Sequence, residues 1–543
     1  MRSVYTLVFA FFAVLAPMQA RADEDPVARE IYALISGPIA GAHNLSPASV
    51  TMARRLYTER QGTPVWRADR RWWTAGIWQD KAVMAQNILA NAGQEGLHPG
   101  DYAAGLRVLP PADATPRQVA EADMLLSVAL LRYIADIRNG RRRPYEIDRE
   151  LQIAPPLIDP LETLREGLNA PDFSAWLRGV APSTPGYTQL RDALARMRTL
   201  AGSGAWPKLP DGPKLEVGQR DDAIVTLRRQ LTLLGDLHAA LPDNDQFDAA
   251  LDLAVKAFQS RHGLDVDGVI GPATRRALNL PPAERVEQII LNMERLRWLD
   301  DNFGPRYVLV NIAGFELIAV NDNKVVIRSP VVVGREYRRT PIFSDRIINL
   351  ILSPSWTPPP RLAKLDILPK VKANPAYLKQ QGLRVFEGWK ADARELNPDT
   401  INWDTVTENN LRFRFRQDPG PLNALGGVRF SLTNSYGIYL HDTSHRELFG
   451  KNSRAFSSGC IRVAKHMELA LFALDNNANW PPARLAEAMI SAKTQVVKLS
   501  SPLPVHIIYR TAWVDSAGML QFRDDIYGRD ALLRAGLKLD VQQ

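Results

Sequence analysis

The stretch Phe456-Ser457-Ser458-Gly459-Cys460-Ile461-Arg462-Val463 holds the only cysteine of this 543-residue chain, and Tyr439-Leu440-His441-Asp442-Thr443 precedes it. With no second cysteine, Cys460 cannot form an internal disulfide. A free thiol has a pKa of about 8.5, so a cysteine nucleophile needs a base beside it, and histidine suits neutral pH. His441 lies 19 positions before Cys460. The pair predicts a nucleophile with its base and points to acyl transfer. A buried cysteine that acts as a small hydrophobe is the alternative reading of these residues.

Around this stretch the sequence indicates a mainly β domain over residues 303–515. β-Branched residues dominate a series of short runs, and this composition is typical of strands. The expected strands are 307–312, 316–320, 324–327, 346–352, 428–432, 437–441 and 505–509. Between them lies a long polar, proline-containing stretch, about 359–427, and so large an insertion indicates a functional lid. Residues 516–543 are expected to form a C-terminal extension.

The residues before this domain favour helices. Apolar side chains recur at three- and four-residue spacing within 27–200, which predicts a helical scaffold domain. Gly and Pro are frequent in 201–214, so that stretch is expected to be a linker. Residues 215–280 form a compact helical unit, in which Leu251, Val255 and Phe258 make one buried stripe. The fold class is therefore multidomain α+β.

The N-terminus is typical of an exported protein. Arg2 precedes an apolar run, and the small residues at Ala20 and Ala22 match a signal-peptidase site, so residues 1–22 are expected to be a signal peptide. The apolar run is shorter than the about 20 residues that a membrane-spanning helix needs. No later segment is long and apolar enough to span a membrane, so no integral membrane segment is expected after cleavage.

The remaining composition excludes several classes of partner. The net charge of +8 is modest for this length and mostly interspersed, and no motif has nucleic-acid-binding spacing, so no nucleic-acid partner is expected. His441 and His445 mimic a His-x-x-x-His zinc site, but such ligands need a helix to share one face, and a strand precedes them. We therefore expect no metal and no cofactor, with His445 and His466 on the surface.

The whole string from Tyr439 to Val463 resembles the catalytic signature of L,D-transpeptidases with a YkuD-type domain. Ser458 stands where most of that family has histidine, as in its larger, YcbB-like members, and His441 is then the only histidine at the position of the base. Further stretches resemble the same family. They are Gly334-Arg335-Glu336-Tyr337-Arg338-Arg339-Thr340-Pro341, Pro354-Ser355-Trp356-Thr357-Pro358 and Arg416-Gln417-Asp418-Pro419-Gly420-Pro421-Leu422-Asn423-Ala424-Leu425-Gly426.

Two other parts of the chain extend this resemblance. Phe247-Asp248, Phe258-Gln259 and Asp267-Gly268-Val269-Ile270-Gly271-x-x-Thr274 are similar to a three-helix peptidoglycan-binding domain. The N-terminal part, which contains Pro64-Val65-Trp66 and Glu95-Gly96-Leu97-His98-Pro99, is similar to the helical scaffold of the same subfamily. The resemblance covers most of the chain after residue 22. It implies a periplasmic protein associated with the cell wall.

The resemblance also implies a mechanism. Cys460 attacks the diaminopimelate carbonyl of a tetrapeptide stem, D-alanine leaves, and an amine of a second stem resolves the thioester into a 3→3 crosslink. His441 acts as base and then as acid. The carbonyl of Asp442 orients His441, and the amides of Gly459 and Cys460 hold the oxyanion.

The remaining expectations concern the substrate pocket and the acceptor. Residues expected to contact substrate are Arg462, Tyr439, Trp356, Ser457 and Ser458, although Arg462 equally fits a role in tying the loop to the β core and the two aromatics a role in the core. With water as acceptor the enzyme would be an L,D-carboxypeptidase, and with a lipoprotein lysine an anchoring transpeptidase. A non-catalytic cell-wall-binding protein is the remaining alternative. Stem peptides are the expected partners, with other cell-wall synthases as candidates.

Overall fold

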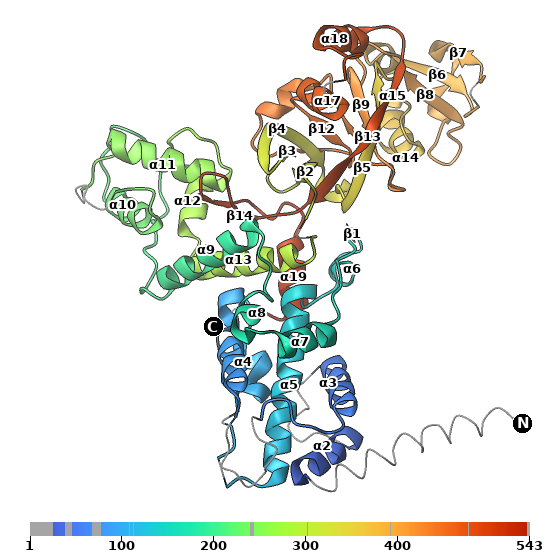
Figure 1. Cartoon of the computed structure of the whole chain (residues 1–543). Coiled ribbons are helices and arrows are strands. Elements are labelled where there is room, and N and C mark those ends of the chain that lie inside the picture. Colours follow the sequence, from blue (N-terminus) through green and yellow to red (C-terminus); the bar gives the residue numbers. More distant parts are fainter. Residues whose placement is uncertain are drawn as a thin grey trace, which may run out of the picture.

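A computed structural model describes most of the chain (Figure 1). The described residues are 25–37, 46–67, 78–107, 109–111, 113–238, 244–300, 302–390, 392–475 and 477–539. The expected signal peptide, 1–22, lies outside them. Figure 1 shows a helical lobe at the bottom, a smaller helical lobe at the left and a β-rich lobe at the upper right. The expectation of a multidomain α+β protein is confirmed.

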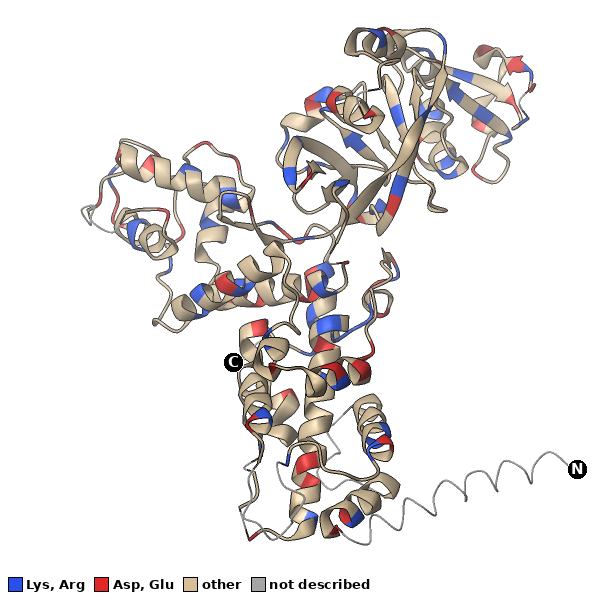
Figure 2. Ribbon diagram, in the orientation of Figure 1, with Lys and Arg blue, Asp and Glu red and all other residues tan. Residues whose placement is uncertain are grey.

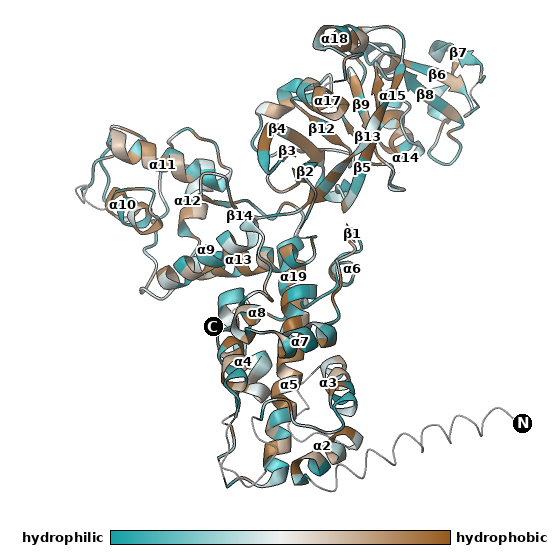
Figure 3. Cartoon of the chain, in the orientation of Figure 1, coloured by the Kyte–Doolittle hydropathy of each residue, from teal (hydrophilic) through white to brown (hydrophobic). Residues whose placement is uncertain are grey.

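The lower lobe is a bundle around one long buried helix, α5, Pro116–Asn139. Thr115 and Gln118 form a capping box at its start, and Gly140, with a positive φ of 76°, ends it. Figure 3 shows hydrophobic residues along α5, where its neighbours cover it. The other helical segments are α2 Pro26–Ser36, α3 Pro47–Glu59, α4 Asp80–Ala90, η1 Ala92–Glu95, η2 Pro99–Leu106, α6 Pro144–Ile147, α7 Pro160–Asn169, α8 Phe173–Arg178 and α9 Pro185–Ala201.

The left lobe consists of α10 Ala223–Leu234, α11 Ala249–His262 and α12 Pro272–Asn279. Leu251, Val255 and Phe258 are buried in its core, as the predicted stripe requires. The stretch expected to be a linker is attached to this lobe rather than loose. Leu209 is fully buried, and the Asn279 side chain bonds its backbone, with 2.7 Å from the Leu209 amide to Asn279 Oδ1. Helix α13, Pro282–Arg297, then leads to the β-rich lobe.

The β-rich lobe is built on one large sheet that closes on itself. Its strand order is β1-β5-β13-β2-β3-β4-β12-β10-β9, β9 also pairs with β5, and β11 pairs with β4. Apolar side chains fill the interior. The strands are β1 Leu151–Gln152, β2 Arg306–Asn311, β3 Glu316–Asn321, β4 Lys324–Gly334, β5 Ile342–Leu352, β9 Val428–Ser431, β10 Leu440–His441, β11 Ala455–Ser457, β12 Ile461–Val463 and β13 Gln495–Ile508. Helical segments η3 Glu336–Arg338, η7 Arg446–Gly450, α17 His466–Leu474 and α18 Pro482–Ile490 connect or cover them.

The insertion between β5 and β9 is a small folded unit with its own core. Trp403 and Phe415 lie in that core, and a separate sheet in the order β7-β6-β8 forms one side. The segments are α14 Pro360–Leu362, the π-helical turn η4 Ala363–Ile367, α15 Leu368–Ala373, α16 Tyr377–Gln380, β6 Leu383–Glu387, β7 Glu395–Leu396, η5 Pro398–Thr400, η6 Trp403–Thr405 and β8 Phe413–Gln417.

Three details differ from the sequence-based boundaries. Leu151 and Gln152, expected within the helical scaffold, form β1 and pair in parallel with β5 of the catalytic sheet. The expected strand 437–441 is shorter in the structure and covers only Leu440 and His441. Gly437 has a positive φ of 69°, which is not an extended conformation, so the strand starts after it. The C-terminal extension is part of the fold, since β14 Ala512–Val514 pairs with β15 Leu520–Phe522 and α19, Arg529–Leu537, packs beside α6 and α13.

The distribution of charged and apolar residues over the structure agrees with the expectations from the sequence. Figure 2 shows basic and acidic residues interspersed over all three lobes, as the sequence predicts. Within the described residues, no helix combines the length and the apolar character that crossing a membrane requires.

Candidate active site

Two short strands bring the cysteine and the histidine together. Strands β10 and β12 pair in parallel, with Leu440 opposite Ile461 and His441 opposite Arg462. Leu440 and Ile461 are fully buried in the core. Because successive side chains of a strand point to opposite faces, His441 and Arg462 lie on the other face, and continuing the register places Cys460 on it as well.

His441 is held in one tautomer by the backbone. It is buried, and its Nδ1 donates a hydrogen bond to the carbonyl of Asp442. Since a carbonyl only accepts, Nδ1 carries the proton and Nε2 keeps its lone pair. Burial first, and then the charge of Arg462, lowers the pKa of His441 to about 3. The ring is therefore neutral at physiological pH and can accept a proton at Nε2.

The Cys460 thiol is surrounded by hydrogen-bond donors from Tyr439. Burial raises the pKa of the thiol, while the backbone N–H and the hydroxyl of Tyr439 lower it by donating to the sulfur. In the other direction, Sγ lies 3.7 Å from the Gly437 carbonyl oxygen. The net pKa is above the ordinary thiol value, so the resting pair is a neutral thiol beside a neutral imidazole.

Aromatic and basic side chains form the rest of this face. Tyr439 packs edge-on against His441 at 5.6 Å between ring centroids, and the Trp356 side chain hydrogen bonds to the Tyr439 hydroxyl. Both aromatics therefore lie beside the thiol. Trp356 also pairs with Gln417 at the base of the insertion, with its amide 2.9 Å from the Gln417 carbonyl oxygen.

Arg429 is a site residue that the sequence reading missed. It lies opposite His441 on β9, so Arg429 and Arg462 flank the histidine from its two neighbouring strands. The Arg429 guanidinium lies 4.2 Å from the centroid of the Tyr439 ring. In the described part of the chain, the Nε atoms of both arginines are buried and have no hydrogen-bond partner. Only the pairing of β9 with β10, which sets Arg429 opposite His441, would have identified Arg429 as a candidate.

The residues before Cys460 form hydrogen bonds mainly within their own loop. The hydroxyl of Ser457 donates to the Cys460 carbonyl at 2.6 Å and accepts the Gly459 amide at 3.1 Å. Gly459 has a φ of 116°, a region that favours glycine. The Gly459 amide is thus engaged within the loop, which differs from its expected role as an oxyanion donor. Ser457 is buried, which differs from its expected contact with substrate.

Ser458 connects the loop to the insertion. Its exposed hydroxyl lies 3.0 Å from the Arg338 guanidinium, and the same guanidinium grips both carboxylate oxygens of Asp366. Asp366 lies in the π-helical turn η4, and such turns are frequent at functional sites. One arginine therefore joins the insertion to the residue two positions before Cys460.

Asp442 is anchored through its side chain as well. Its carboxylate accepts the Gly427 amide at 2.9 Å and the Arg446 guanidinium at 2.8 Å, and His466 Nδ1 lies 3.1 Å from it. His466 is thus partly buried, because its ring packs against this carboxylate, and its predicted surface position is wrong. His445 is exposed, as expected. The described residues include no group of three or more metal-ligating side chains.

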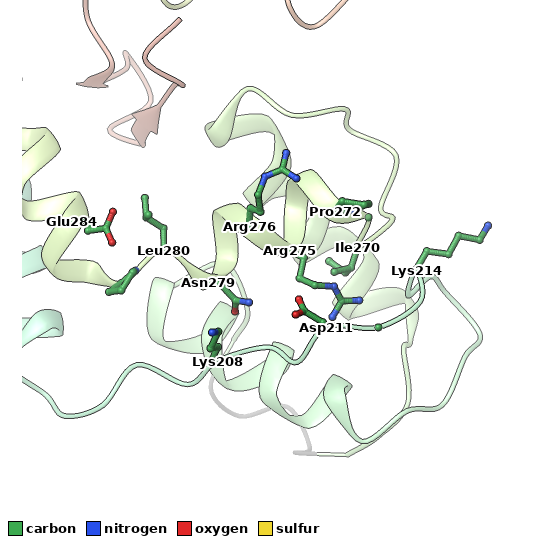
Figure 4. Close-up of a pocket in the computed structure, with 13 residues that line it drawn as sticks. Lys208, Asp211, Lys214, Ile270, Pro272, Arg275, Arg276, Asn279, Leu280 and Glu284 are labelled. Atoms are coloured by element: carbon green, nitrogen blue, oxygen red, sulfur yellow. The ribbon is translucent and has the colours of Figure 1, made fainter. Parts of the chain in front are cut away.

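A separate cavity of about 690 Å³ lies at the left lobe (Figure 4). The segment 208–214 forms one wall and the start of α12 the other. Arg275 is buried and holds the wall by donating to the carbonyls of Pro210 and Pro213. Lys208, Lys214 and Arg276 are exposed at the rim, and Asp211 and Glu284 also line the cavity.

Comparison with known proteins assigns a family to each lobe. Residues 305–477 match the family described as "L,D-transpeptidase catalytic domain", named YkuD. Residues 220–278 match "Putative peptidoglycan binding domain", and residues 52–194 match "Scaffold domain". The matched ranges correspond to the β-rich, left and lower lobes.

Two curated proteins are similar to parts of the chain. A Haemophilus influenzae protein named "Putative L,D-transpeptidase" is 34% identical over 244 residues, which is 45% of this chain and 48% of that protein. An N-acetylmuramoyl-L-alanine amidase of Mycobacterium tuberculosis is 44% identical over 80 residues, which is 13% of this chain and 20% of that protein. The chain thus spans less than half the length of either relative.

Among solved structures, an L,D-transpeptidase of Stackebrandtia nassauensis is 13% identical, with a TM-score of 0.23, and the match covers 56% of this chain and 97% of that one. At this TM-score, the likeness carries no argument about the fold. The domain matches and the first of the curated relatives agree with the resemblance of the catalytic stretch. The chain therefore carries a YkuD-type L,D-transpeptidase catalytic domain, joined to a peptidoglycan-binding domain and a scaffold domain.

Proposed function

We propose that the protein is a peptidoglycan L,D-transpeptidase that forms 3→3 crosslinks through a thioester on Cys460. The observation that carries this proposal is the geometry of β10 and β12. These strands set Cys460 and His441 on one face, and the hydrogen bond from Nδ1 to the Asp442 carbonyl leaves His441 Nε2 unprotonated. A base beside a thiol is one of the arrangements that activate a cysteine nucleophile for acyl transfer.

The reaction has two balanced halves. His441 Nε2 takes the thiol proton while the sulfur attacks the diaminopimelate carbonyl of a tetrapeptide stem. The C–N bond to the terminal D-alanine breaks, and the amine leaves with the proton from His441. The amine of a second stem then attacks the thioester and gives a proton to His441, the C–S bond breaks, and His441 returns that proton to the sulfur to restore the thiol. The Cys460 amide is our candidate for an oxyanion donor, because the Gly459 amide is engaged by Ser457.

Carboxylates of the stem are proposed to bind the two arginines beside His441. Arg429 and Arg462 have buried Nε atoms without partners among the described residues. A buried guanidinium is costly unless an anion pairs with it, and a carboxylate matches its fork geometry. Substrate binding would therefore complete the hydrogen bonding of this face. Trp356, Tyr439 and the exposed Ser458 complete the proposed wall of the site.

The first prediction tests donor and acceptor together. Purified protein incubated with disaccharide-tetrapeptides is expected to release D-alanine and give a dimer linked between two diaminopimelate residues, as read by chromatography and tandem mass spectrometry. A tripeptide monomer as the only product would instead show an L,D-carboxypeptidase. Transfer to a lipoprotein C-terminal lysine peptide added in parallel would show an anchoring enzyme. No product from any acceptor would contradict the catalytic proposal and favour a purely wall-binding protein.

We also propose that the cavity at the left lobe holds an anionic part of peptidoglycan. The rim carries Lys208, Lys214 and Arg276, and these cations outnumber the acids Asp211 and Glu284. Buried Ile270 adds an apolar wall on which a sugar ring can rest. About 690 Å³ is within the usual size of a ligand pocket, roughly 300–1,000 Å³. Attachment to the wall would place the exported enzyme in the periplasm beside its substrate.

The second prediction concerns this cavity. Changing Lys208, Lys214 and Arg276 to alanine is expected to weaken cosedimentation with purified sacculi about tenfold, which corresponds to roughly 1.4 kcal/mol. The matched control changes three exposed lysines of the β-rich lobe, Lys324, Lys493 and Lys498, and alters the net charge equally. Equal binding by both triple variants would show that net charge, and not the cavity, carries the attachment. The soluble acylation rate should be the same in both.

A further inference from the structure

The loop that carries Cys460 is fastened to a second loop, residues 335–341, which joins β4 to β5. The amide of Arg335 donates to the Ser457 carbonyl at 3.0 Å. The hydroxyl of Thr340, which is fully buried, donates to the Gly459 carbonyl at 2.8 Å. The carbonyl next to the nucleophile is therefore positioned by Thr340, and a shift of the second loop would shift Cys460.

The second loop is in turn held by Tyr527. Its hydroxyl donates to the Gly334 carbonyl at 2.5 Å and accepts the Thr340 amide at 3.2 Å. The side chain is 1% exposed, so solvent does not replace these bonds. Tyr527 lies in the C-terminal segment, 50 positions beyond the end of the family match at residue 477. Tyr527 therefore lies outside the range that the catalytic-domain family matches.

Tyr527 is connected to the scaffold through Arg529. The Arg529 guanidinium lies 5.0 Å from the centroid of the Tyr527 ring and is 1% exposed. It donates to Asp148 at 3.1 Å and to Glu150 at 3.0 Å, both just beyond α6 of the scaffold. A buried guanidinium needs such carboxylates to remain charged at tolerable cost. The two acids therefore fix Arg529 under the Tyr527 ring.

The scaffold also holds the far end of the same loop. The Ile342 amide donates to the Glu150 carbonyl at 3.0 Å, and Leu151 pairs with Ile342 as part of β1. Ile342 follows Thr340 by two positions. One short scaffold segment, 148–152, thus reaches the loop directly through the backbone and indirectly through Arg529 and Tyr527.

We propose that Tyr527 is a positioning residue for the nucleophile, and that the scaffold segment 148–152 acts on Cys460 through Arg529, Tyr527 and Thr340. The proposal rests on the proposed function only in taking Cys460 as the nucleophile. It implies that the scaffold is part of the catalytic unit and is more than a spacer between the wall and the enzyme. Without these contacts, the loop would still follow the same course, but the position of Cys460 relative to His441 would no longer be fixed.

The third prediction tests Tyr527→Phe in the full-length protein. The variant keeps the ring and removes both hydrogen bonds, so kcat/KM for acylation by a carbapenem is expected to fall about tenfold, mainly in kcat. The rate of Cys460 alkylation by iodoacetamide, followed against pH, should shift along the pH axis, because the burial and the Tyr439 donors that set the pKa of the thiol both depend on its position. Tyr102→Phe is the matched control, since Tyr102 is equally buried and donates to Asp136 at 2.9 Å within the scaffold.

Two further variants separate positioning from folding. Thr340→Ser keeps the hydroxyl that reaches Gly459 and should retain the rate and the pH curve, whereas Thr340→Val removes it and should resemble Tyr527→Phe. Asp148→Asn with Glu150→Gln should slow acylation in the same sense. Combined with Tyr527→Phe, it should add little, because both act on one path.

The outcomes are decisive in both directions. If Tyr527→Phe changes neither kcat nor the alkylation curve more than Tyr102→Phe does, the positioning role is wrong. Full additivity of the scaffold variant with Tyr527→Phe would contradict the connection through Arg529. The alkylation curve needs only a reactive thiol, so it reads the position of Cys460 even if the muropeptide assay finds no crosslink. A failure of the proposed function is thereby distinguished from a failure of this inference.

Discussion

Replacing Cys460 with serine is expected to lower the rate of acylation roughly a thousandfold or more, because the nucleophile of a covalent mechanism has no substitute. The environment makes this loss severe. Burial and the charge of Arg462 lower the pKa of His441 to about 3, so the imidazole is too weak a base to deprotonate a serine hydroxyl. The measurement is the mass of the peptide bearing residue 460 after incubation with a carbapenem, together with crosslinked muropeptides from tetrapeptide substrate.

Cys460→Ala provides the companion result. It should form no acyl adduct and no crosslink, yet it should sediment with sacculi as the wild type does, because the cavity at the left lobe is untouched. Crosslinks formed by the alanine variant would show that Cys460 is not the nucleophile. Loss of sacculus binding would show that the active site and the wall-binding lobe do not act separately.

The sequence supports the local half of the site. Cys460 and His441 are 19 positions apart, and a strand that ends at His441 followed by a returning loop is enough to predict that the two come together. Their common face follows from the parallel pairing of β10 with β12. The resemblance of the same stretch supplied the catalytic family, which the domain match confirms. Strand composition likewise predicted most of the β domain, because β-branched and aromatic residues suit a pleated, half-buried surface.

The parts that the sequence did not reveal depend on long-range pairing. Arg429 enters the site only because β9 pairs with β10, and no pattern near residue 429 indicates that register. Arg338 reaches Ser458 across 120 positions, and Tyr527 reaches Gly334 across 193. The hydrogen bond of the Gly459 amide was not foreseen for a different reason. Its donor is used by a hydroxyl two residues away, and a sequence motif does not show where a short loop directs its own hydrogen bonds.

The neutral state of the pair gives the site its distinctive pH behaviour. In many cysteine enzymes a thiolate and an imidazolium form an ion pair at rest. Here burial raises the pKa of Cys460 and lowers that of His441, so both groups are uncharged over the working range. Two nearby cations, Arg429 and Arg462, oppose an imidazolium and would attract an anionic substrate. Proton transfer is therefore expected to accompany attack rather than to precede it.

Replacing His441 with glutamine is expected to lower the acylation rate about a hundredfold or more, the usual contribution of a general base. The pH dependence should change as well as the rate. A histidine whose pKa is about 3 stays unprotonated at any pH where the protein is folded, so the wild-type rate should be nearly flat from about pH 5 to about pH 8. The glutamine variant can react only through the thiolate. Its rate should rise about tenfold for each pH unit up to the raised pKa of Cys460.

The two curves should therefore converge as the pH increases, because the thiolate that the variant needs becomes abundant while the advantage of the base fades. Stopped-flow acylation by a carbapenem across this range measures both curves, and circular dichroism at each pH shows that the variant is folded. A wild-type inflection near pH 6.5, the ordinary histidine value, would contradict the lowered pKa. Fast alkylation by iodoacetamide at about pH 5 would instead reveal a resting thiolate, and the ion-pair mechanism would replace the neutral one.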